Sequence, residues 1–146
     1  MIKIFVLHGP NLNLLGKREV TQYGESNLEE LNQNLVHYGE EKGVRISTAQ
    51  SNLEGELINH LQDAEGKFAG VVFNPGGYTH TSVAIRDAVK AIDIPVIEVH
   101  LTNILGREEF RHISVVAPVC TGTIAGFGVT SYLLGIDALL YILEQV

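Results

Sequence analysis

The fold is decided by the stretch VVFNPGGYTH at residues 71–80, where an apolar run stops abruptly in a polar cluster that contains Pro and Gly. The same pattern recurs in IFVLHGPN at residues 4–11 and in VIEVHLTN at residues 96–103. Short, β-branched apolar runs bounded by Gly and Pro predict buried strands. Ligands of open parallel sheets bind outside the carboxyl ends of the strands, so we expect the His, Asn and Thr of these ends to form one site.

Amphipathic segments with helix-start signals separate the predicted strands. Ser26–Glu29 and Ser51–Glu54 have the spacing of a capping box, and a one-sided apolar face follows each of them. A third helix is expected to be capped by Thr81 or Ser82. A last helix, around residues 130–143, is apolar nearly all round, which indicates burial on more than one side or a subunit contact.

Alternating strands and helices with short connections predict an α/β fold, with a parallel sheet that is covered by helices on both faces. The strands are expected at Ile2–Leu7, Val44–Gln50, Gly70–Asn74, Pro95–His100 and Ser114–Ala117. A five-stranded sheet in a chain of this length suits a flavodoxin-like strand order of 2-1-3-4-5. We expect one domain over residues 1–146, and we interpret the Gly-rich segment at 122–128 as close packing.

The composition limits the classes of partner. The chain has 146 residues and a formal net charge of −7, which argues against nucleic acid or an anionic membrane as the main partner. Cys120 is the single cysteine, so an intrachain disulfide is impossible and a reducing, cytoplasmic location is expected. No apolar run approaches the ~20 residues of a membrane helix, and the strand that begins the sequence is too short for a signal peptide.

One connection is far longer than the others. About eighteen residues without clear periodicity separate the first strand from the helix that follows, whereas ~2–6 residues are usual for a βα loop. Long loops of this kind are often functional, and we expect a catalytic lid at about residues 17–25. The polar side chains that favour this interpretation are Asn11, Asn13, Arg18 and Tyr23.

The sequence contains six histidines, which raises the question of a metal site. None of them has the helical spacing of a zinc ligand pair with a partnering carboxylate or cysteine, so no metal site is expected. His80 and His100 stand at strand-end clusters, where a titrating or hydrogen-bonding role is expected. Glu98 lies two residues before His100 on the same face of the strand, so we expect it to orient the imidazole and favour its protonated form.

Arg107 and Arg111 lie four residues apart, so one helical turn would place both side chains on one face. Two interpretations remain open. Either the neighbouring Glu108 and Glu109 simply pair with the two arginines, or at least one guanidinium points at a ligand carboxylate or polyol beside the strand ends. The convergence of three strand ends slightly favours the ligand contact.

Several of these segments together resemble the type II 3-dehydroquinate dehydratases. The resemblance covers essentially the whole chain in the family's order. Its segments are HGPNLN at residues 8–13, LGKRE at 15–19, YG at 23–24, NPGGYTHTS at 74–82, EVHLTN at 98–103, REEFR at 107–111 and APVCTG at 117–122. Each fragment alone is a weak signal, but their common register is highly specific.

This resemblance implies a flavodoxin-like fold and the reversible dehydration of 3-dehydroquinate to 3-dehydroshikimate, a step of the shikimate pathway. Proteins of this family work without a metal, a cofactor or a Schiff base, by an anti elimination through an enolate. The resemblance also implies a homo-oligomer, usually a dodecamer, in which Asp87 reaches into the site of a neighbouring subunit.

The same resemblance implies the catalytic roles. Tyr23 is the base that removes the axial proton next to the ketone, with Arg18 beside it. His100, backed by Glu98, is the acid that protonates the departing hydroxyl, and Asn11 helps to hold a water against the enolate oxygen. An unperturbed tyrosine has a pKa near ~10, and a nearby permanent guanidinium charge is a suitable device to favour its anion.

The substrate-binding roles follow from the resemblance as well. The side chain of Asn74, the backbone amide of Leu101 and the hydroxyl of Thr102 are implied to bind the substrate carboxylate. His80 and Arg111 are implied to bind the ring hydroxyls. These groups come from two of the predicted strand ends, at residues 71–80 and 96–103, and from the segment that follows the second of them.

A non-catalytic flavodoxin-like binding or signalling module is the competing interpretation. A receiver-type module needs an acidic cluster at the first strand end, and a flavin-binding module needs a Ser/Thr-rich phosphate loop there, whereas this chain has HGPN at residues 8–11. A third possibility is an enzyme of the same fold that acts on another cyclic hydroxy acid. Ultraviolet absorbance separates these interpretations, because dehydroshikimate is a conjugated enone and dehydroquinate is not.

Overall fold

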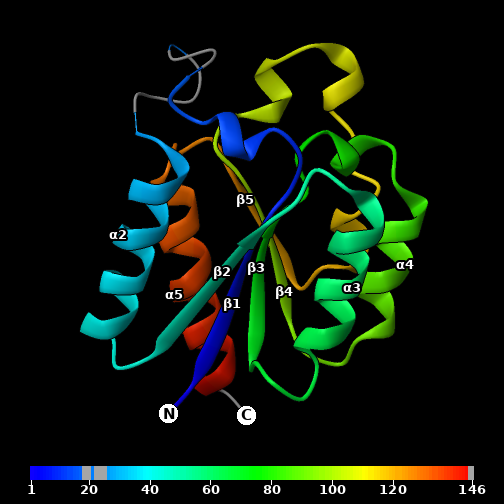
Figure 1. The fold of residues 1–146 in the computed structure, drawn as a ribbon. Coiled ribbons are helices and arrows are strands. Elements are labelled where there is room, and N and C mark those ends of the chain that lie inside the picture. Colours follow the sequence, from blue (N-terminus) through cyan, green and yellow to red (C-terminus); the bar gives the residue numbers. More distant parts are fainter. Residues whose placement is uncertain (18–20, 22–25, 145–146) are drawn as a thin grey trace.

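A parallel sheet sets the architecture of the chain. The computed structural model describes residues 1–17, 21 and 26–144. The strands lie in the order β2-β1-β3-β4-β5, which confirms the predicted order (Figure 1). The strands are β1 (Lys3–His8), β2 (Arg45–Gln50), β3 (Gly70–Asn74), β4 (Val96–His100) and β5 (Gly122–Ala125). The α-helices of the described residues are α2 (Leu28–Glu41), α3 (Glu54–Ala64), α4 (Val83–Ala91) and α5 (Thr130–Glu144).

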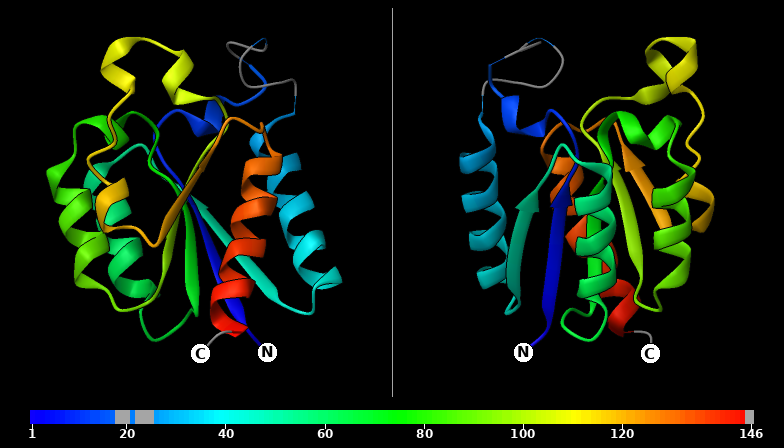
Figure 2. Two further views of the ribbon diagram at one scale, coloured as in Figure 1. Left: turned by 180° about the vertical axis from the view of Figure 1, so that it is seen from behind. Right: turned by 45° about the vertical axis from the view of Figure 1, so that its right-hand side comes forward.

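Helices cover both faces of the sheet, with α2 and α5 on one face and α3 and α4 on the other (Figures 1 and 2). The alternation of side chains along the strands explains the two layers. In β1, Ile4 and Val6 enter the core cluster with α2 and α5, whereas Phe5 and Leu7 enter the cluster with α3 and α4. A strand buried on both faces needs a continuous apolar run, which is the pattern that predicted these strands.

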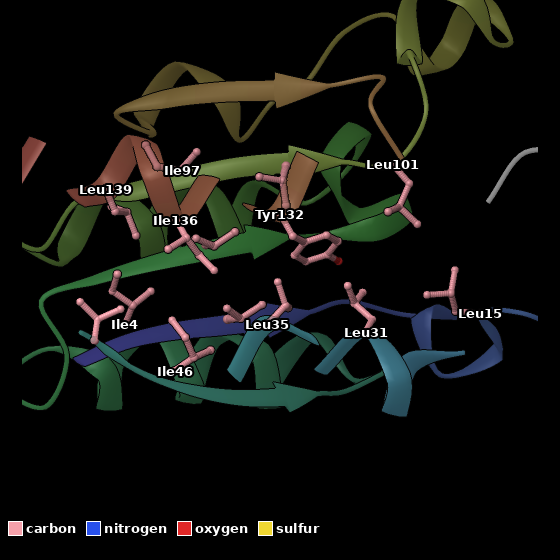
Figure 3. Packing of buried hydrophobic residues seen from close by; sticks show 14 residues of the cluster. Ile4, Leu15, Leu31, Leu35, Ile46, Ile97, Leu101, Tyr132, Ile136 and Leu139 are labelled. Carbon is pink, nitrogen blue, oxygen red and sulfur yellow. The ribbon is translucent and has the colours of Figure 1, made fainter. Parts of the chain in front are cut away.

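Helix α5 packs closely against the middle of the sheet. Tyr132 and Ile136 are fully buried in this layer (Figure 3). An added Cβ at Gly135 would lie 3.0 Å from a methyl of Val72 and 3.1 Å from a methyl of Val99, so the glycine permits the close approach. Burial of each large apolar side chain contributes roughly 1.5–3 kcal/mol to folding. Neither α5 nor any other described helix is long and apolar enough to cross a membrane.

Ser82 links the two helices on the opposite face. Its hydroxyl accepts from the Ile85 amide at 2.9 Å and so caps α4, which confirms the second of the two predicted caps. The same hydroxyl donates at 2.5 Å to Glu54, the first residue of α3. The capping box predicted for the start of α3 is therefore wrong, because Glu54 serves the next helix and Ser51 donates to Glu56 instead.

The start of α2 also differs from the expectation by one residue. The N-cap is Asn27 and not Ser26, and the Asn27 side chain accepts from the Glu30 amide at 2.9 Å. An asparagine is at least as good a cap as a serine, so the adjacent residue takes the role that the sequence pattern assigned to Ser26. Gly43 follows the helix with φ +76°, a left-handed conformation that glycine adopts readily at the end of a helix.

The fifth strand lies elsewhere than predicted. β5 spans Gly122–Ala125 and pairs in parallel with β4, so the Gly-rich segment interpreted as close packing is a strand at the edge of the sheet. The predicted strand at Ser114–Ala117 does not form. The Ser114 hydroxyl accepts from the Ala117 amide at 2.9 Å and turns the chain into a short 3-10 helix, η5, which spans Ala117–Val119.

Candidate functional site

A pocket of about 190 Å³ opens at the carboxyl ends of β1, β3 and β4. Its walls come from the segments that follow these strands, at the end of the sheet where the strand arrows point in Figure 1. This is the place at which ligands bind in open parallel sheets. The lining residues are Pro10, Asn11, Leu12, Leu15, Asn74, Gly76, Gly77, His80, His100, Leu101, Thr102, Ile104, Arg107 and Arg111.

The pocket brings together most of the residues singled out in the sequence. Those that line it are Asn11, Asn74, His80, His100, Leu101, Thr102 and Arg111. The segments that follow three strands distant in the sequence therefore line one pocket. Glu98 lies behind His100, and the exposed Asp87 on α4 is not among the lining residues. Arg18 and Tyr23, with most of the segment expected as a lid, lie outside the described residues.

His100 is the last residue of β4 and is held by a buried carboxylate. Its Nε2 lies 2.9 Å from Oε2 of Glu98, and the two side chains are 7% and 1% exposed. The other oxygen of Glu98 accepts a hydrogen bond of 2.9 Å from the Ser114 hydroxyl, whose own oxygen accepts backbone amides. Ser114 begins the strand that was expected at Ser114–Ala117, and in the structure its hydroxyl holds the carboxylate that orients His100.

The two arginines of the pocket share one carboxylate. Nε of Arg111 lies 3.2 Å from Glu108, and Nε of Arg107 lies 3.7 Å from the same oxygen. A backbone hydrogen bond and the two guanidiniums, Arg111 foremost, keep the pKa of Glu108 below its usual value. The first alternative therefore holds for Glu108, which pairs with both arginines. The ligand contact of the second alternative stays a prediction, although both arginines line the pocket. Arg107 precedes a 3-10 helix, η4 (Glu109–Arg111), so the predicted single helical turn is wrong.

The charge of the pocket is opposite to that of the chain. The chain has a net charge of −7, yet the lining among the described residues includes two arginines and neither Asp nor Glu. Guanidinium groups match the planar geometry of a carboxylate and remain charged at any physiological pH. The lining therefore favours a small anionic ligand that also carries hydrogen-bonding groups.

His80 belongs to the 3-10 helix η2 (Gly76–His80) that follows β3. Its Nδ1 donates to the carbonyl oxygen of Ile113 at 2.8 Å, because a carbonyl oxygen only accepts. In the neutral ring the proton is thus on Nδ1, and Nε2 is an acceptor. The contact holds the ring in the pocket wall, so that Nε2 can accept a hydrogen bond from a ligand hydroxyl.

The ends of β1 and β3 touch each other directly below the pocket. The Gly9 amide donates to the carbonyl oxygen of Asn74 at 2.7 Å, and a Cβ at Gly9 would lie 2.6 Å from the backbone of Pro75. Asn11 then adopts a left-handed conformation with φ 71°, which asparagine tolerates better than most residues. The Asn11 amide donates to Asn52, which fixes the turn that carries Asn11 into the pocket wall.

His8 differs from the other strand-end residues because it does not line the pocket. It is fully buried, with Nδ1 2.9 Å from the Tyr132 hydroxyl and Nε2 2.8 Å from Oδ1 of Asn32. Burial lowers its pKa from 6.5 to about 4, so the ring is neutral at physiological pH. Tyr132 also accepts from Nδ2 of Asn74 at 3.1 Å. Tyr132 lies in the segment at 130–143 that the sequence predicts as an apolar helix, and that pattern gives no sign of these polar contacts.

The described residues contain no cluster of three His, Cys, Asp or Glu side chains that could hold a metal ion. The single cysteine, Cys120, is partly buried, and burial raises the pKa of its thiol to about 12. A thiol in this state is a poor nucleophile because only the thiolate attacks. Among the described lining residues, imidazole, guanidinium, amide and hydroxyl groups are therefore the polar side-chain groups that a ligand can meet.

Comparison with known proteins gives one consistent result. The family model for Dehydroquinase class II matches residues 2–140. The chain is 59% identical over 137 residues to the 3-dehydroquinate dehydratase of Pelotomaculum thermopropionicum, which covers 94% of this chain and 95% of that protein. It is 52% identical to the 3-dehydroquinate dehydratase of Trichodesmium erythraeum, with coverage of 99% and 97%.

The solved structures agree with the sequence relatives. The type II dehydroquinase from Butyrivibrio crossotus superposes with a TM-score of 0.94 at 48% identity, and the match covers 95% of this chain and 97% of that one. A 3-dehydroquinate dehydratase-like protein from Bifidobacterium longum superposes with a TM-score of 0.74 at 32% identity, with 98% of both chains covered. The likeness thus extends over nearly the whole chain.

Proposed function

The chain belongs to the class II dehydroquinase family, and on that premise we propose that it removes water from 3-dehydroquinate in the pocket at the carboxyl ends of β1, β3 and β4. The protein is a hydro-lyase, a 3-dehydroquinate dehydratase of the shikimate pathway. The observation that carries the placement is the convergence of Asn74, His80, His100 and Arg111 on one pocket whose described lining is cationic. A carboxylate-bearing, hydroxyl-rich substrate matches such a lining.

Substrate binding is proposed to use the residues that follow β3 and β4, and Arg111. The side chain of Asn74, the amide of Leu101 and the hydroxyl of Thr102 bind the carboxylate, and His80 and Arg111 bind ring hydroxyls. The presence of all five residues in the pocket lining supports these roles. Leu101 and Thr102 come directly after β4, so the backbone there no longer belongs to the sheet and its amides are available to a ligand.

The elimination is proposed to begin with proton removal by Tyr23. The proton next to the ketone goes to the phenolate oxygen, and the electron pair of the broken C–H bond forms an enolate. Arg18 favours the phenolate, at about 1.4 kcal/mol for each pKa unit by which it lowers the value of ~10. These two roles rest on the motif resemblance at residues 15–19 and 23–24, which lies largely outside the described residues.

The second half of the reaction is proposed to use His100. As the enolate collapses, the C–O bond breaks and the imidazolium proton goes to the departing hydroxide, which leaves as water. The buried carboxylate of Glu98, 2.9 Å from Nε2, supports this role because it can balance the charge of the imidazolium. Asn11 is proposed to hold a water against the enolate oxygen, and its place in the lining supports that.

An absorbance assay tests the function. Loss of water from 3-dehydroquinate gives a conjugated enone, so the purified enzyme is expected to produce a steady rise in ultraviolet absorbance. The rate is expected to survive a chelator, and borohydride with substrate is expected to leave the enzyme active, because no imine forms. Binding of 3-dehydroquinate without any rise in absorbance would favour the non-catalytic module instead.

The role of Tyr23 is tested by Tyr23→Phe, which removes only a hydroxyl. We expect kcat to fall by about 10²–10⁴-fold while the affinity for substrate barely changes. Arg18→Ala is expected to lower kcat with a residual activity that rises toward high pH, since the unassisted tyrosine ionises there. Tyr38→Phe is the matched control, because the Tyr38 hydroxyl donates to Asp137 away from the pocket. A near-normal kcat for Tyr23→Phe would move the base to another residue.

Assembly is a separate part of the proposal. We propose a homo-oligomer, a dodecamer, in which Asp87 contributes to the site of a neighbouring subunit. Asp87 is exposed on α4, and Val83, one helical turn earlier, is 61% exposed, which supports a contact on this face. Sedimentation is expected to show a species far larger than 16.0 kDa, and an active monomer would refute both statements. The cytoplasmic location stays a prediction that rests on the single cysteine.

A further inference from the structure

A chain of hydrogen bonds runs behind the pocket through five elements of the fold. It begins at the Gly76 amide in η2, which donates to Oδ1 of Asn74 at 3.0 Å. Nδ2 of Asn74 contacts the Tyr132 hydroxyl at 3.1 Å, and this hydroxyl lies 2.9 Å from Nδ1 of His8. Nε2 of His8 lies 2.8 Å from Oδ1 of Asn32 on α2. The chain therefore ties β1, β3, α2 and α5 to one wall of the pocket.

The direction of this chain follows from its first bond. A backbone amide only donates, so the Asn74 atom that faces Gly76 is the oxygen and the atom that faces Tyr132 is the nitrogen. The nitrogen of an amide only donates, so the Tyr132 oxygen accepts and its hydrogen points to His8. Nδ1 of His8 must then lack a proton, Nε2 must carry one, and Asn32 must present its oxygen.

Burial supports the neutral state that this direction needs. His8 and Tyr132 are both 0% exposed, and burial lowers the pKa of His8 to about 4. The two strands bring the polar ends together, because His8 and Asn74 are register partners on the adjacent parallel strands β1 and β3. Their side chains thus leave the sheet on the same face, where α5 supplies Tyr132 between them.

We propose that Tyr132, His8 and Asn32 are positioning residues that, together with the Gly76 amide, hold Asn74 as a hydrogen-bond donor toward the substrate. The Asn74 amide has two N–H bonds, and Tyr132 takes one of them. The second is left for a ligand in the pocket that Asn74 lines, and a carboxylate is an acceptor without donors. This role rests on the carboxylate contact proposed above for Asn74. A reversed chain would instead turn the Asn74 carbonyl oxygen toward the anion and repel it.

The protonation of His8 tests the direction of the chain in the intact enzyme. Nitrogen-15 NMR of the protein labelled at histidine distinguishes a protonated from an unprotonated ring nitrogen. At neutral pH we expect His8 as a neutral ring that carries its proton on Nε2. A proton on Nδ1, or a positively charged ring, would reverse or interrupt the chain and would overturn the inference. This measurement needs no substitution and therefore no variant that folds.

A double-mutant cycle tests the effect on substrate. Tyr132→Phe removes the hydroxyl alone, and a lost or misdirected hydrogen bond to a charged group weakens binding by about tenfold or more. We expect KM for 3-dehydroquinate to rise about tenfold with kcat changed less than about threefold. In the Asn74→Ala background the same substitution is expected to change KM less than about twofold, because the group that it positions is gone.

The controls separate this inference from the proposed function. Tyr38→Phe removes a hydroxyl that joins α2 to α5 through Asp137, and it is expected to leave KM and kcat unchanged. An equal rise in KM from Tyr132→Phe in both backgrounds, or no rise in either, would overturn the positioning role. Unchanged KM in Asn74→Ala alone would instead contradict the carboxylate contact proposed for Asn74, and the NMR result would still report whether the chain runs as inferred.

Discussion

Two buried hydrogen-bond chains reach the same pocket from opposite faces of the sheet, and they differ in charge. On the face covered by α2 and α5, His8 meets an amide and a phenol, from Asn32 and Tyr132. On the face covered by α3 and α4, His100 meets the carboxylate of Glu98. Both histidines end an apolar strand, so the partner and not the position along the strand decides what each imidazole does.

The difference between the two chains suggests a division of labour. A neutral histidine between neutral groups is a fixed dipole, which suits the positioning of a substrate contact. A histidine beside a carboxylate can gain a proton and hand it over, which suits acid catalysis. We therefore expect substitutions in the His8 chain to act on binding and stability, and substitutions in the His100 chain to act on the chemical step.

The largest effect is expected from His100→Ala. Removal of a general acid typically slows a reaction by about 10²–10⁴-fold, and the loss should appear in kcat as measured by enone absorbance. His37→Ala is the control, because His37 is exposed and pairs with Glu41 on α2. A kcat within about threefold of the parent value for His100→Ala would show that another group protonates the leaving hydroxyl.

The next effect is expected in the pH dependence of stability, and it comes from His8. The pKa of His8 is about 4 in the folded protein, below the ordinary histidine value of 6.5, so the unfolded chain binds the proton more tightly. The free energy of unfolding should therefore decrease as the pH falls from about 6.5 to about 4, by about 3 kcal/mol from this group. Urea unfolding across this range measures it.

A pair of histidine variants separates the contribution of His8 to this pH dependence from that of the Asp and Glu side chains. His8→Gln is expected to lower stability at neutral pH and to flatten the slope between pH 4 and 6.5, because the titrating ring is gone. His37→Gln removes an exposed histidine and is expected to keep the slope. Equal slopes in the parent and in His8→Gln would mean that His8 is not the buried neutral group described here.

A smaller effect is expected where the ends of β1 and β3 meet beneath the pocket. Gly9→Ala would place a Cβ 2.6 Å from the backbone of Pro75, so the strand ends must separate, at about 1–3 kcal/mol in the free energy of unfolding. Gly55→Ala is the matched control, because a Cβ at Gly55 of α3 meets nothing within 4 Å. Equal urea midpoints for the two variants would contradict the tight contact at Gly9.

The sequence predicts the sheet order and most of the pocket because both depend on local patterns. Continuous apolar runs mark β1, β3 and β4, and the polar residues just after them, such as Asn74 and His100, fall where parallel strands gather their ends. The position of β5 could not be predicted because Gly122–Ala125 has no such apolar run. The apolar segment Ser114–Ala117 does not form a strand, because the Ser114 hydroxyl accepts from the Ala117 amide and the chain turns into a 3-10 helix.

The hydrogen-bond chain through His8 could not be predicted because its residues are far apart in the sequence. His8 and Tyr132 are separated by 124 positions, and nothing near either residue signals the contact. Tyr132 sits in an apolar helix where a tyrosine is expected to be ordinary core. The one local sign is the tyrosine itself. A fully buried phenol needs a hydrogen-bond partner, so a tyrosine in an apolar helix indicates a buried polar group nearby.

The division of labour is tested most directly by steady-state kinetics on two single-hydroxyl deletions, one in each chain. Ser114→Ala removes the donor to Glu98, and Tyr132→Phe removes the acceptor from Asn74. We predict that Ser114→Ala lowers kcat about tenfold with KM within about threefold of the parent, whereas Tyr132→Phe raises KM about tenfold with kcat within about threefold. If both variants changed the same constant, the two chains would not divide binding from chemistry.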